Sequence, residues 1–201
     1  MLPAGDAAVL VELADLDQVG RLYASLRDSP LPGTLDVVPA TRTILLGLDP
    51  AVTGPDRVAA ALRERTLPAA IDRGATRLVE IPTSYDGPDL ADVAALTGLG
   101  EDEVVRRHGA AEWTVAFCGF APGFAYMLGG DPALRVPRRE TPRTAVPAGS
   151  IGLADAFTGA YPRRMPGGWQ LIGRTDAVLW DLDRDPPALL PPGTRVRFVP
   201  A

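Results

Sequence analysis

The feature of the sequence that limits the fold most is the frequent glycine and proline of the second half, which divide it into short segments. From Trp113 onward, short apolar segments alternate with turn signals. The signals include Pro122-Gly123, Gly129-Gly130, Pro147-Ala148-Gly149, Pro166-Gly167-Gly168 and Pro192-Gly193. Such spacing leaves no room for long helices but suits short strands joined by tight turns. We therefore predict a small all-β barrel or sandwich, closed by a strand that alternates polar and apolar residues over 195–198.

The first half follows a different pattern, in which strand-like apolar runs alternate with helical periodicity. Strand character is found at 7–13, 35–38, 43–48 and 78–81. Asp15 precedes one helical pattern and Pro55 opens another, both typical helix starts. The order β-α-β-β-α-β is that of a ferredoxin-like domain, with both helices on one face of an antiparallel sheet. We predict this domain over 1–82, a linker near 72–75, and the β-barrel domain over 83–201, giving an α+β protein.

Two short helical patterns between residues 89 and 108 are expected at the start of the second domain. Ala94, Gly98 and Val104 have the spacing of a DNA-binding helix-turn-helix. The leading end of its second helix, however, would be 101–103, which is Glu-Asp-Glu and would repel phosphates. Together with a net charge of −5, this argues against nucleic-acid binding.

Composition excludes several classes of chemistry. All 20 basic residues are arginine, so a P-loop lysine, a Schiff base and a biotin or lipoyl attachment lysine are absent from this chain. No apolar run approaches the roughly 20 residues of a membrane span. A single cysteine, Cys118, cannot form an intrachain disulfide, which favours a reducing, cytoplasmic location. We expect no membrane association and no covalently attached cofactor.

His108 is the only histidine, so any nucleophile–histidine chemistry of this chain must use it. The alternative is a structural role, because His108 ends a helical pattern where an imidazole can cap the helix or pack against its apolar side. Ser150 is a weak nucleophile candidate, since Ala148 stands where a nucleophile elbow requires glycine. With one histidine and one cysteine, no metal site is predicted.

Arginines and aromatic residues are concentrated between His108 and Thr175. Phe120, Phe124 and Tyr126 surround the Pro122-Gly123 turn, where they could line a pocket or fill a core. Guanidinium groups that follow in a proline-stiffened segment suit carboxylate, carbonate or phosphate, although a charged, solvated strand edge would look the same. Our binding candidates are Arg138, Arg143, Arg174, Tyr126, Tyr161 and Gln170.

At these positions the sequence resembles a family whose members are variously called the B subunit of 5-oxoprolinase, allophanate hydrolase subunit 1 and the Kip sporulation-kinase inhibitor, of the carboxyltransferase subdomain C and D type. The resemblance rests on His108 and on segments 119–126, 137–143, 146–152, 158–162 and 166–175. Two departures are Ala121 and Ala125, where the family commonly has leucine and proline. The resemblance extends more loosely over nearly the whole chain.

The resemblance implies a ferredoxin-like domain followed by a cyclophilin-like barrel. It also implies a carboxyltransferase-like partner subunit, with a third subunit expected as well, and ATP-dependent opening of 5-oxoproline to glutamate. On this interpretation the chain is inactive alone and ATP is bound in the assembled complex. The candidate residues bind and position a small anionic substrate, with His108 in proton transfer or orientation. A histidine-kinase inhibitor and an allophanate hydrolase or urea carboxylase-type subunit are the alternatives that the sequence leaves open.

Overall fold

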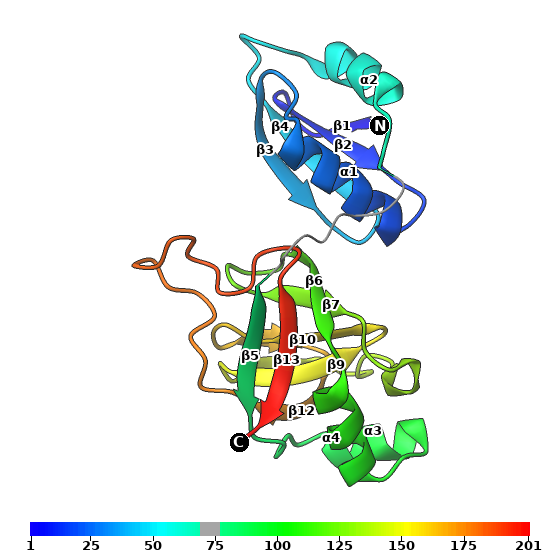
Figure 1. Cartoon of the computed structure of the whole chain (residues 1–201), viewed down its shortest axis with the longest axis vertical. Coiled ribbons are helices and arrows are strands. Elements are labelled where there is room, and N and C mark those ends of the chain that lie inside the picture. The colour runs from blue at the N-terminus through cyan, green and yellow to red at the C-terminus, as the bar shows by residue number, and fades with distance from the viewer. Residues whose placement is uncertain (69–76) are drawn as a thin grey trace. The chain divides into compact units, whose positions relative to one another are not determined.

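The structure is a computed structural model that describes residues 1–68 and 77–201 (Figure 1). The chain forms two compact units, residues 1–74 and 75–201. The predicted linker at 72–75 lies outside the described residues. In the described part of the chain, no helix is long and apolar enough to cross a membrane.

The first unit is a four-stranded antiparallel sheet with two helices. Its elements are β1 (Leu2–Pro3), β2 (Ala8–Glu12), α1 (Leu16–Asp28), β3 (Thr34–Pro39), β4 (Thr43–Leu48) and α2 (Pro55–Glu64). Alternate residues of β2 and β4, such as Val9 and Leu46, are buried together with Val19 of α1 and Val58 of α2. Because alternate strand residues share one face of a sheet, both helices cover the same face.

The predicted ferredoxin-like order of this unit is not confirmed. The strands lie in the order β1-β2-β4-β3, so the edge beside β2 is taken by Leu2–Pro3. The strand expected to fill that edge, β5 (Leu78–Thr83), instead pairs in parallel with β13 (Arg195–Pro200) in the second unit. The predicted elements themselves are present, but the last strand of the pattern belongs to the other sheet.

The second unit is a nearly closed barrel. Its further elements are α3 (Leu90–Thr97), α4 (Glu101–Ala110), β6 (Trp113–Cys118), β7 (Ala125–Leu128), the 3-10 turn η1 (Pro132–Leu134), β8 (Arg143–Val146), β9 (Ser150–Ala154), β10 (Phe157–Ala160), β11 (Met165–Gly167) and β12 (Gln170–Arg174). Seven strands follow the order β12-β9-β10-β7-β6-β13-β5. Ser84, just after β5, exchanges two backbone hydrogen bonds with Arg174 of β12, at 2.9 and 2.8 Å, and this bridge joins the two edges.

This unit has two hydrophobic cores. The first contains residues from all seven strands, among them Val115, Met127 and Ile172, and therefore fills the interior of the barrel. Helices α3 and α4, side by side at one end of the barrel in Figure 1, add Val93 and Val104 to it. The second core lies on the outside of the barrel, since its strand residues are those that alternate with the first set. It comprises Phe124, Val146, Ala154, Tyr161, Met165, Trp169 and Leu171.

Candidate functional site

The aromatic residues around the Pro122-Gly123 turn mostly serve the outer core. Phe124 is 1% exposed and makes edge-to-face contacts with Tyr161 and Trp169, with ring centroids 5.1 and 5.4 Å apart. Gly123 has φ +82°, a conformation that glycine adopts readily, and a side chain there would meet Trp180. The turn therefore fixes Phe124 under the loop, and of the two predicted roles, pocket or core, this ring has the second.

Tyr126 and Tyr161 bring two phenol groups to this face of the barrel. Burial raises the pKa of Tyr161 to about 12, although a backbone hydrogen bond from Trp169 and the charges of Arg138 and Arg143 lower it. Burial also raises the pKa of Tyr126, against the lowering effect of Arg138. Both phenols are thus protonated at neutral pH, and the charge of Arg138 acts on both of them. The structure brings three predicted binding residues, Tyr126, Tyr161 and Arg138, into one neighbourhood.

Arg138 is the most available cation of this neighbourhood. Its side chain is 57% exposed, and its one ion-pair partner in the described chain is Asp155, with Nε 3.8 Å from Oδ2. This distance is at the limit of an ion pair, and the attraction is weakened further by solvent. The guanidinium can exchange this weak contact for bidentate hydrogen bonds donated to a carboxylate or phosphate.

Arg143 is held in a buried ionic network that the sequence did not reveal. Its Nη1 and Nη2 donate to the two carboxylate oxygens of Asp89 at 2.8 and 2.7 Å, and Nη1 of Arg139 donates to Oδ1 at 2.7 Å. The backbone N–H of Leu171 donates to Oδ2 at 2.7 Å. The side chain of Asp89 is 2% exposed. Two cations therefore surround one carboxylate, and the network fastens segment 137–143 to the start of α3.

The charge state of Asp89 follows from these contacts. Burial acts to raise its pKa, but the hydrogen bonds from Arg143 and Leu171 and the charges of Arg143 and Arg139 outweigh it. The pKa of Asp89 consequently lies below its ordinary value, and the carboxylate is ionised at neutral pH. The network as a whole keeps a surplus of one positive charge.

Gln170 lies close to the same segment. It is 6% exposed, and its Nε2 donates to the carbonyl oxygen of Pro137 at 3.3 Å. Its Oε1 is buried and has no hydrogen-bond partner among the described residues. The same is true of the Nε of Arg139. An unpaired buried amide oxygen is uncommon, and it leaves one acceptor of the predicted binding set unused.

His108 lies in the interior of the unit and not with the other candidates. It is 0% exposed, with its Nδ1 2.8 Å from the hydroxyl of Tyr85 and its Nε2 2.9 Å from Oγ1 of Thr158. Thr158 donates its own proton to the carbonyl oxygen of Gly152 at 3.1 Å. The threonine oxygen therefore accepts from Nε2, which makes Nε2 the protonated nitrogen and Nδ1 the acceptor of the Tyr85 proton.

Burial also determines the protonation state of this histidine. It lowers the pKa of His108 to about 3, so the ring is neutral at physiological pH. Both ring nitrogens are occupied, and the ring packs against Trp113 and Phe198, with centroids 5.1 and 4.6 Å apart. This geometry supplies neither an open nitrogen nor a path to a substrate. The packing alternative accounts for His108, and proton transfer to a bound ligand does not follow from its position.

Arg174 also lies apart from the other binding candidates. It ends β12, four residues beyond Gln170, which is roughly 13 Å along a strand. Its Nε donates to Asp86 at 2.9 Å in a pair that is more than half exposed on both sides. The predicted set therefore divides into four groups. Arg138, Arg143, Tyr126 and Tyr161 form an outer-face group, Gln170 lies beside Pro137 on the other side of β12, Arg174 is peripheral and His108 is internal.

The described residues offer no conventional nucleophile or metal centre. Burial raises the pKa of the Cys118 thiol to about 11, and its Sγ donates to the carbonyl oxygen of Leu190 at 3.4 Å. Ser150 is 6% exposed, its backbone N–H donates to the carbonyl oxygen of Pro147, and its C=O accepts from the N–H of Tyr161. Across 1–68 and 77–201, no three His, Cys, Asp or Glu side chains are grouped so as to hold a metal ion.

Comparison with known proteins gives a consistent result. Residues 1–190 match the family described as the carboxyltransferase domain, subdomain C and D. The chain is 41% identical to the B subunit of 5-oxoprolinase from Escherichia coli O157:H7, over 98% of this chain and 93% of that protein. It is 35% identical to the protein of the same name from Bacillus subtilis (strain 168), over 97% of this chain and 90% of that one.

Solved structures extend the comparison to the fold. The crystal structure of TTHA0988 matches 96% of this chain with a TM-score of 0.80 and 36% identity. This chain spans only 39% of TTHA0988, so the matching part is joined there to a longer polypeptide. Kluyveromyces lactis urea carboxylase matches with a TM-score of 0.73, over 99% of this chain and 21% of its own, but at 18% identity it shows a shared fold alone.

Proposed function

The chain belongs to the family of the carboxyltransferase domain, subdomain C and D, and on that premise we propose that it is the B-type subunit of an ATP-dependent 5-oxoprolinase. The complex would convert 5-oxo-L-proline to L-glutamate, with a carboxyltransferase-like partner subunit and a third subunit. The observation that carries the proposal is the match to two proteins named as B subunits of 5-oxoprolinase, at 35% identity or more and along nearly the full length of each chain.

The outer-face site supports a role in binding and orienting the substrate. 5-Oxoproline carries one carboxylate, and Arg138 offers an exposed guanidinium whose contact with Asp155 is 3.8 Å long and whose charge lowers the pKa of the nearby Tyr126. The surplus positive charge of the Asp89 network lies in the same segment, 137–143. A carboxylate bound there would gain charge-assisted hydrogen bonds.

The chemical step requires groups that the described residues do not provide. Cys118 is protonated, and His108 is enclosed and fully paired, so no nucleophile–base pair is formed. The chain has no lysine and no P-loop, which leaves ATP phosphates to arginines or to another subunit. We therefore propose that the chain is inactive alone and works in the cytoplasm as part of a hetero-oligomer.

Reconstitution tests this proposal. The purified chain, the carboxyltransferase-like subunit and the third subunit from the same organism are assayed singly and together for release of glutamate from 5-oxoproline, with and without ATP. We expect glutamate only from the complete mixture with ATP. Full activity of the partner subunits in the absence of this chain, or no glutamate from the complete mixture, would overturn the assignment.

The two alternative functions lack comparable support. The similarity to urea carboxylase is at 18% identity and concerns the fold only. Both the Escherichia coli and the Bacillus subtilis relative carry the 5-oxoprolinase name, and neither name refers to a kinase. Replacing 5-oxoproline by allophanate or urea in the same mixture gives the direct control, and we expect no turnover of either.

A further inference from the structure

Three loops of the second unit meet beside the Pro122-Gly123 turn. A side chain built at Gly123 would lie 2.8 Å from Cβ of Trp180 and 3.3 Å from Cβ of Pro162, so these three residues are in close contact. Pro122, Pro162, Arg163 and Trp180 line a surface cavity of about 310 Å³. The loops are 119–124, the connection after β10, and the long segment 175–194 between β12 and β13.

Phe120 is an exposed ring in a strained conformation on the first of these loops. It is 61% exposed and has φ +69°, which is unusual for a residue other than glycine, asparagine or aspartate. Its loop is fixed by backbone hydrogen bonds from Gly119 to Phe124 (3.2 Å) and from Phe124 to Ala121 (3.0 Å). A rigid loop that holds an aromatic ring out of the core, at a cost in backbone strain, is typical of a binding surface.

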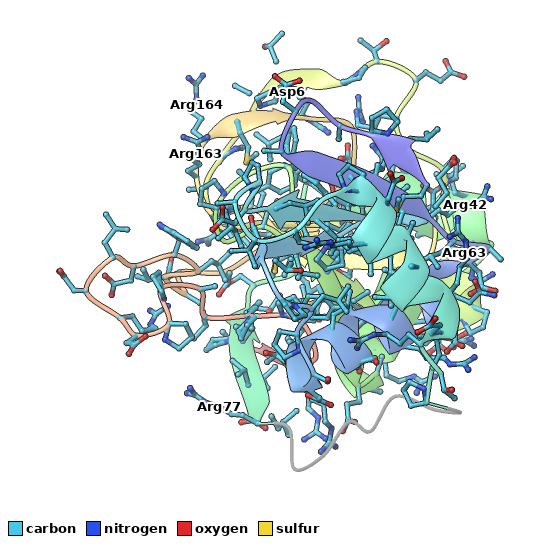
Figure 2. The ribbon with its side chains drawn as sticks, turned by 90° about the horizontal axis from the view of Figure 1, so that it is seen from above. Asp6, Arg42, Arg63, Arg77, Arg163 and Arg164 are labelled. Carbon is cyan, nitrogen blue, oxygen red and sulfur yellow. The ribbon has the colours of Figure 1, made fainter. Side chains whose placement is uncertain are left out.

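Arg163 and Arg164 add positive charge to the same place. Both are exposed, and neither has an ion-pair or side-chain hydrogen-bond partner in the part of the chain that the structure describes. Figure 2 shows both side chains extending outward from their loop. The carboxylate of Asp181, next to Trp180, is directed toward Arg184 instead, at 3.9 Å. Two adjacent unpaired arginines are notable in a chain whose net charge is −5.

We propose that this surface, made by Phe120, Pro122, Pro162, Arg163, Arg164 and Trp180 and here called the Phe120–Trp180 surface, docks the carboxyltransferase-like partner subunit through an apolar side chain flanked by carboxylates. The proposal rests on the proposed function, which supplies the partner. The cavity between the prolines and Trp180 receives the apolar group, and Arg163 and Arg164 pair with the carboxylates.

A protein occupant agrees best with the observations. Exposed aromatic residues, tryptophan and arginine are the residue types that dominate protein–protein interfaces. The unpaired charges require acidic groups opposite them, because like charges at an interface are unfavourable. In TTHA0988 the matching part belongs to a longer chain, of which further polypeptide makes up about three fifths, so in that relative more protein is attached to this fold.

Binding of the purified partner subunit to the full chain, measured by titration calorimetry at low and at high salt, tests the surface. We expect Phe120→Ala to weaken binding about tenfold and the double variant R163E/R164E to weaken it by about 30-fold or more. The double variant should also reduce the salt dependence of binding, because it removes the exposed ion pairs. The matched control is R42E/R63E, which makes the same charge change at exposed arginines of the first unit.

The outcomes separate the two proposals. If the unaltered chain does not bind the partner, the proposed function fails and the docking surface fails with it. Should the unaltered chain bind and both surface variants bind equally well, only the surface is wrong. Equal weakening by R163E/R164E and R42E/R63E would show an effect of total charge and would likewise overturn the surface. Far-UV circular dichroism of each variant, which reports on the secondary structure of both units, confirms that it is folded before the titration.

Discussion

The second unit contains two buried polar networks that differ in charge and in completeness. The network of His108 with Tyr85 and Thr158 is neutral, and each proton has one acceptor. The network of Asp89 is ionic, with two arginines for one carboxylate, and Nε of Arg139 has no partner among the described residues. A neutral network in which every group is paired stabilises the fold and has no unpaired donor or acceptor for a ligand. An ionic network with surplus charge both fastens a segment and leaves that segment electropositive.

Substitution of Asp89 is expected to have the largest effect, and it tests the difference between the ionic and the neutral network. Asp89→Ala leaves Arg143 and Arg139 without their counter-ion and the buried N–H of Leu171 without an acceptor. We expect a loss of about 4 kcal/mol in the free energy of unfolding, because two partly buried guanidinium groups and the N–H of Leu171 lose their partner together. All three tryptophans lie in the second unit, so their fluorescence in urea reports on this unit. Asp86→Ala, which breaks an exposed pair with Arg174, should leave the same transition unchanged; equal effects would refute the distinction.

Removal of His108 tests whether the neutral network is structural. His108→Ala creates a cavity beside Trp113 and Phe198 and leaves the Tyr85 hydroxyl unpaired. We expect a loss of about 3 kcal/mol in unfolding free energy, from the cavity and the orphaned donor together. In the reconstituted complex, at a temperature where the variant is folded, kcat should stay within about threefold of the unaltered protein. A fall of a hundredfold or more in kcat with normal stability would restore the catalytic role that the sequence suggested.

The neutral state of His108 also predicts how stability depends on pH. Its pKa is about 3 in the folded chain and about 6.5 when unfolded, so the unfolded chain takes up a proton first as the pH falls. The contribution of neutral His108 to the free energy of unfolding is complete above pH 6.5. It is lost between pH 6.5 and 3, by about 1.4 kcal/mol for each pH unit. Urea unfolding between pH 7 and 5 measures this slope, above the range where most carboxylates titrate. Since His108 is the only histidine, His108→Gln should flatten it; an unchanged slope would contradict the assignment.

Local patterns predicted elements better than their pairing. The Asp15 cap is present, with its side chain accepting from the backbone N–H of Gln18 at 2.9 Å, and the Pro122-Gly123 turn also forms as predicted. Strand 78–83 exists, yet its sequence carries no information that its partner is 195–200 at the other end of the chain. The ferredoxin-like order is not confirmed there because it assumed pairing within the first unit.

The sequence predicted which segment holds the candidate site, but it did not predict the role of each residue in that segment. Phe120 and Phe124 look alike in sequence, and only the turn between them decides that one is exposed and the other buried. Asp89 stands alone after a proline, with no local sign that arginines 50 and 54 residues away converge on it. His108 could be a base or a core residue on sequence grounds. Burial, which is a tertiary property, decides in favour of the core.

The smallest effect that we expect is a change in KM, and it distinguishes Arg138 from Arg174, the two exposed arginines of the predicted binding set. The charge of Arg138 lowers the pKa of Tyr126 and of Tyr161, and its contact with Asp155 is 3.8 Å long. Arg174, at the end of β12, is paired more closely with Asp86, at 2.9 Å. We expect Arg138→Ala to raise KM for 5-oxoproline about threefold in the reconstituted complex with kcat unchanged, because it removes a contact made equally in the ground and transition states. Arg174→Ala, of the same charge change and similar exposure, should leave KM within experimental error. The Arg138 effect should shrink at high salt, as for any exposed charge. A larger rise in KM for Arg174→Ala than for Arg138→Ala would move the carboxylate site from the outer face to the end of β12.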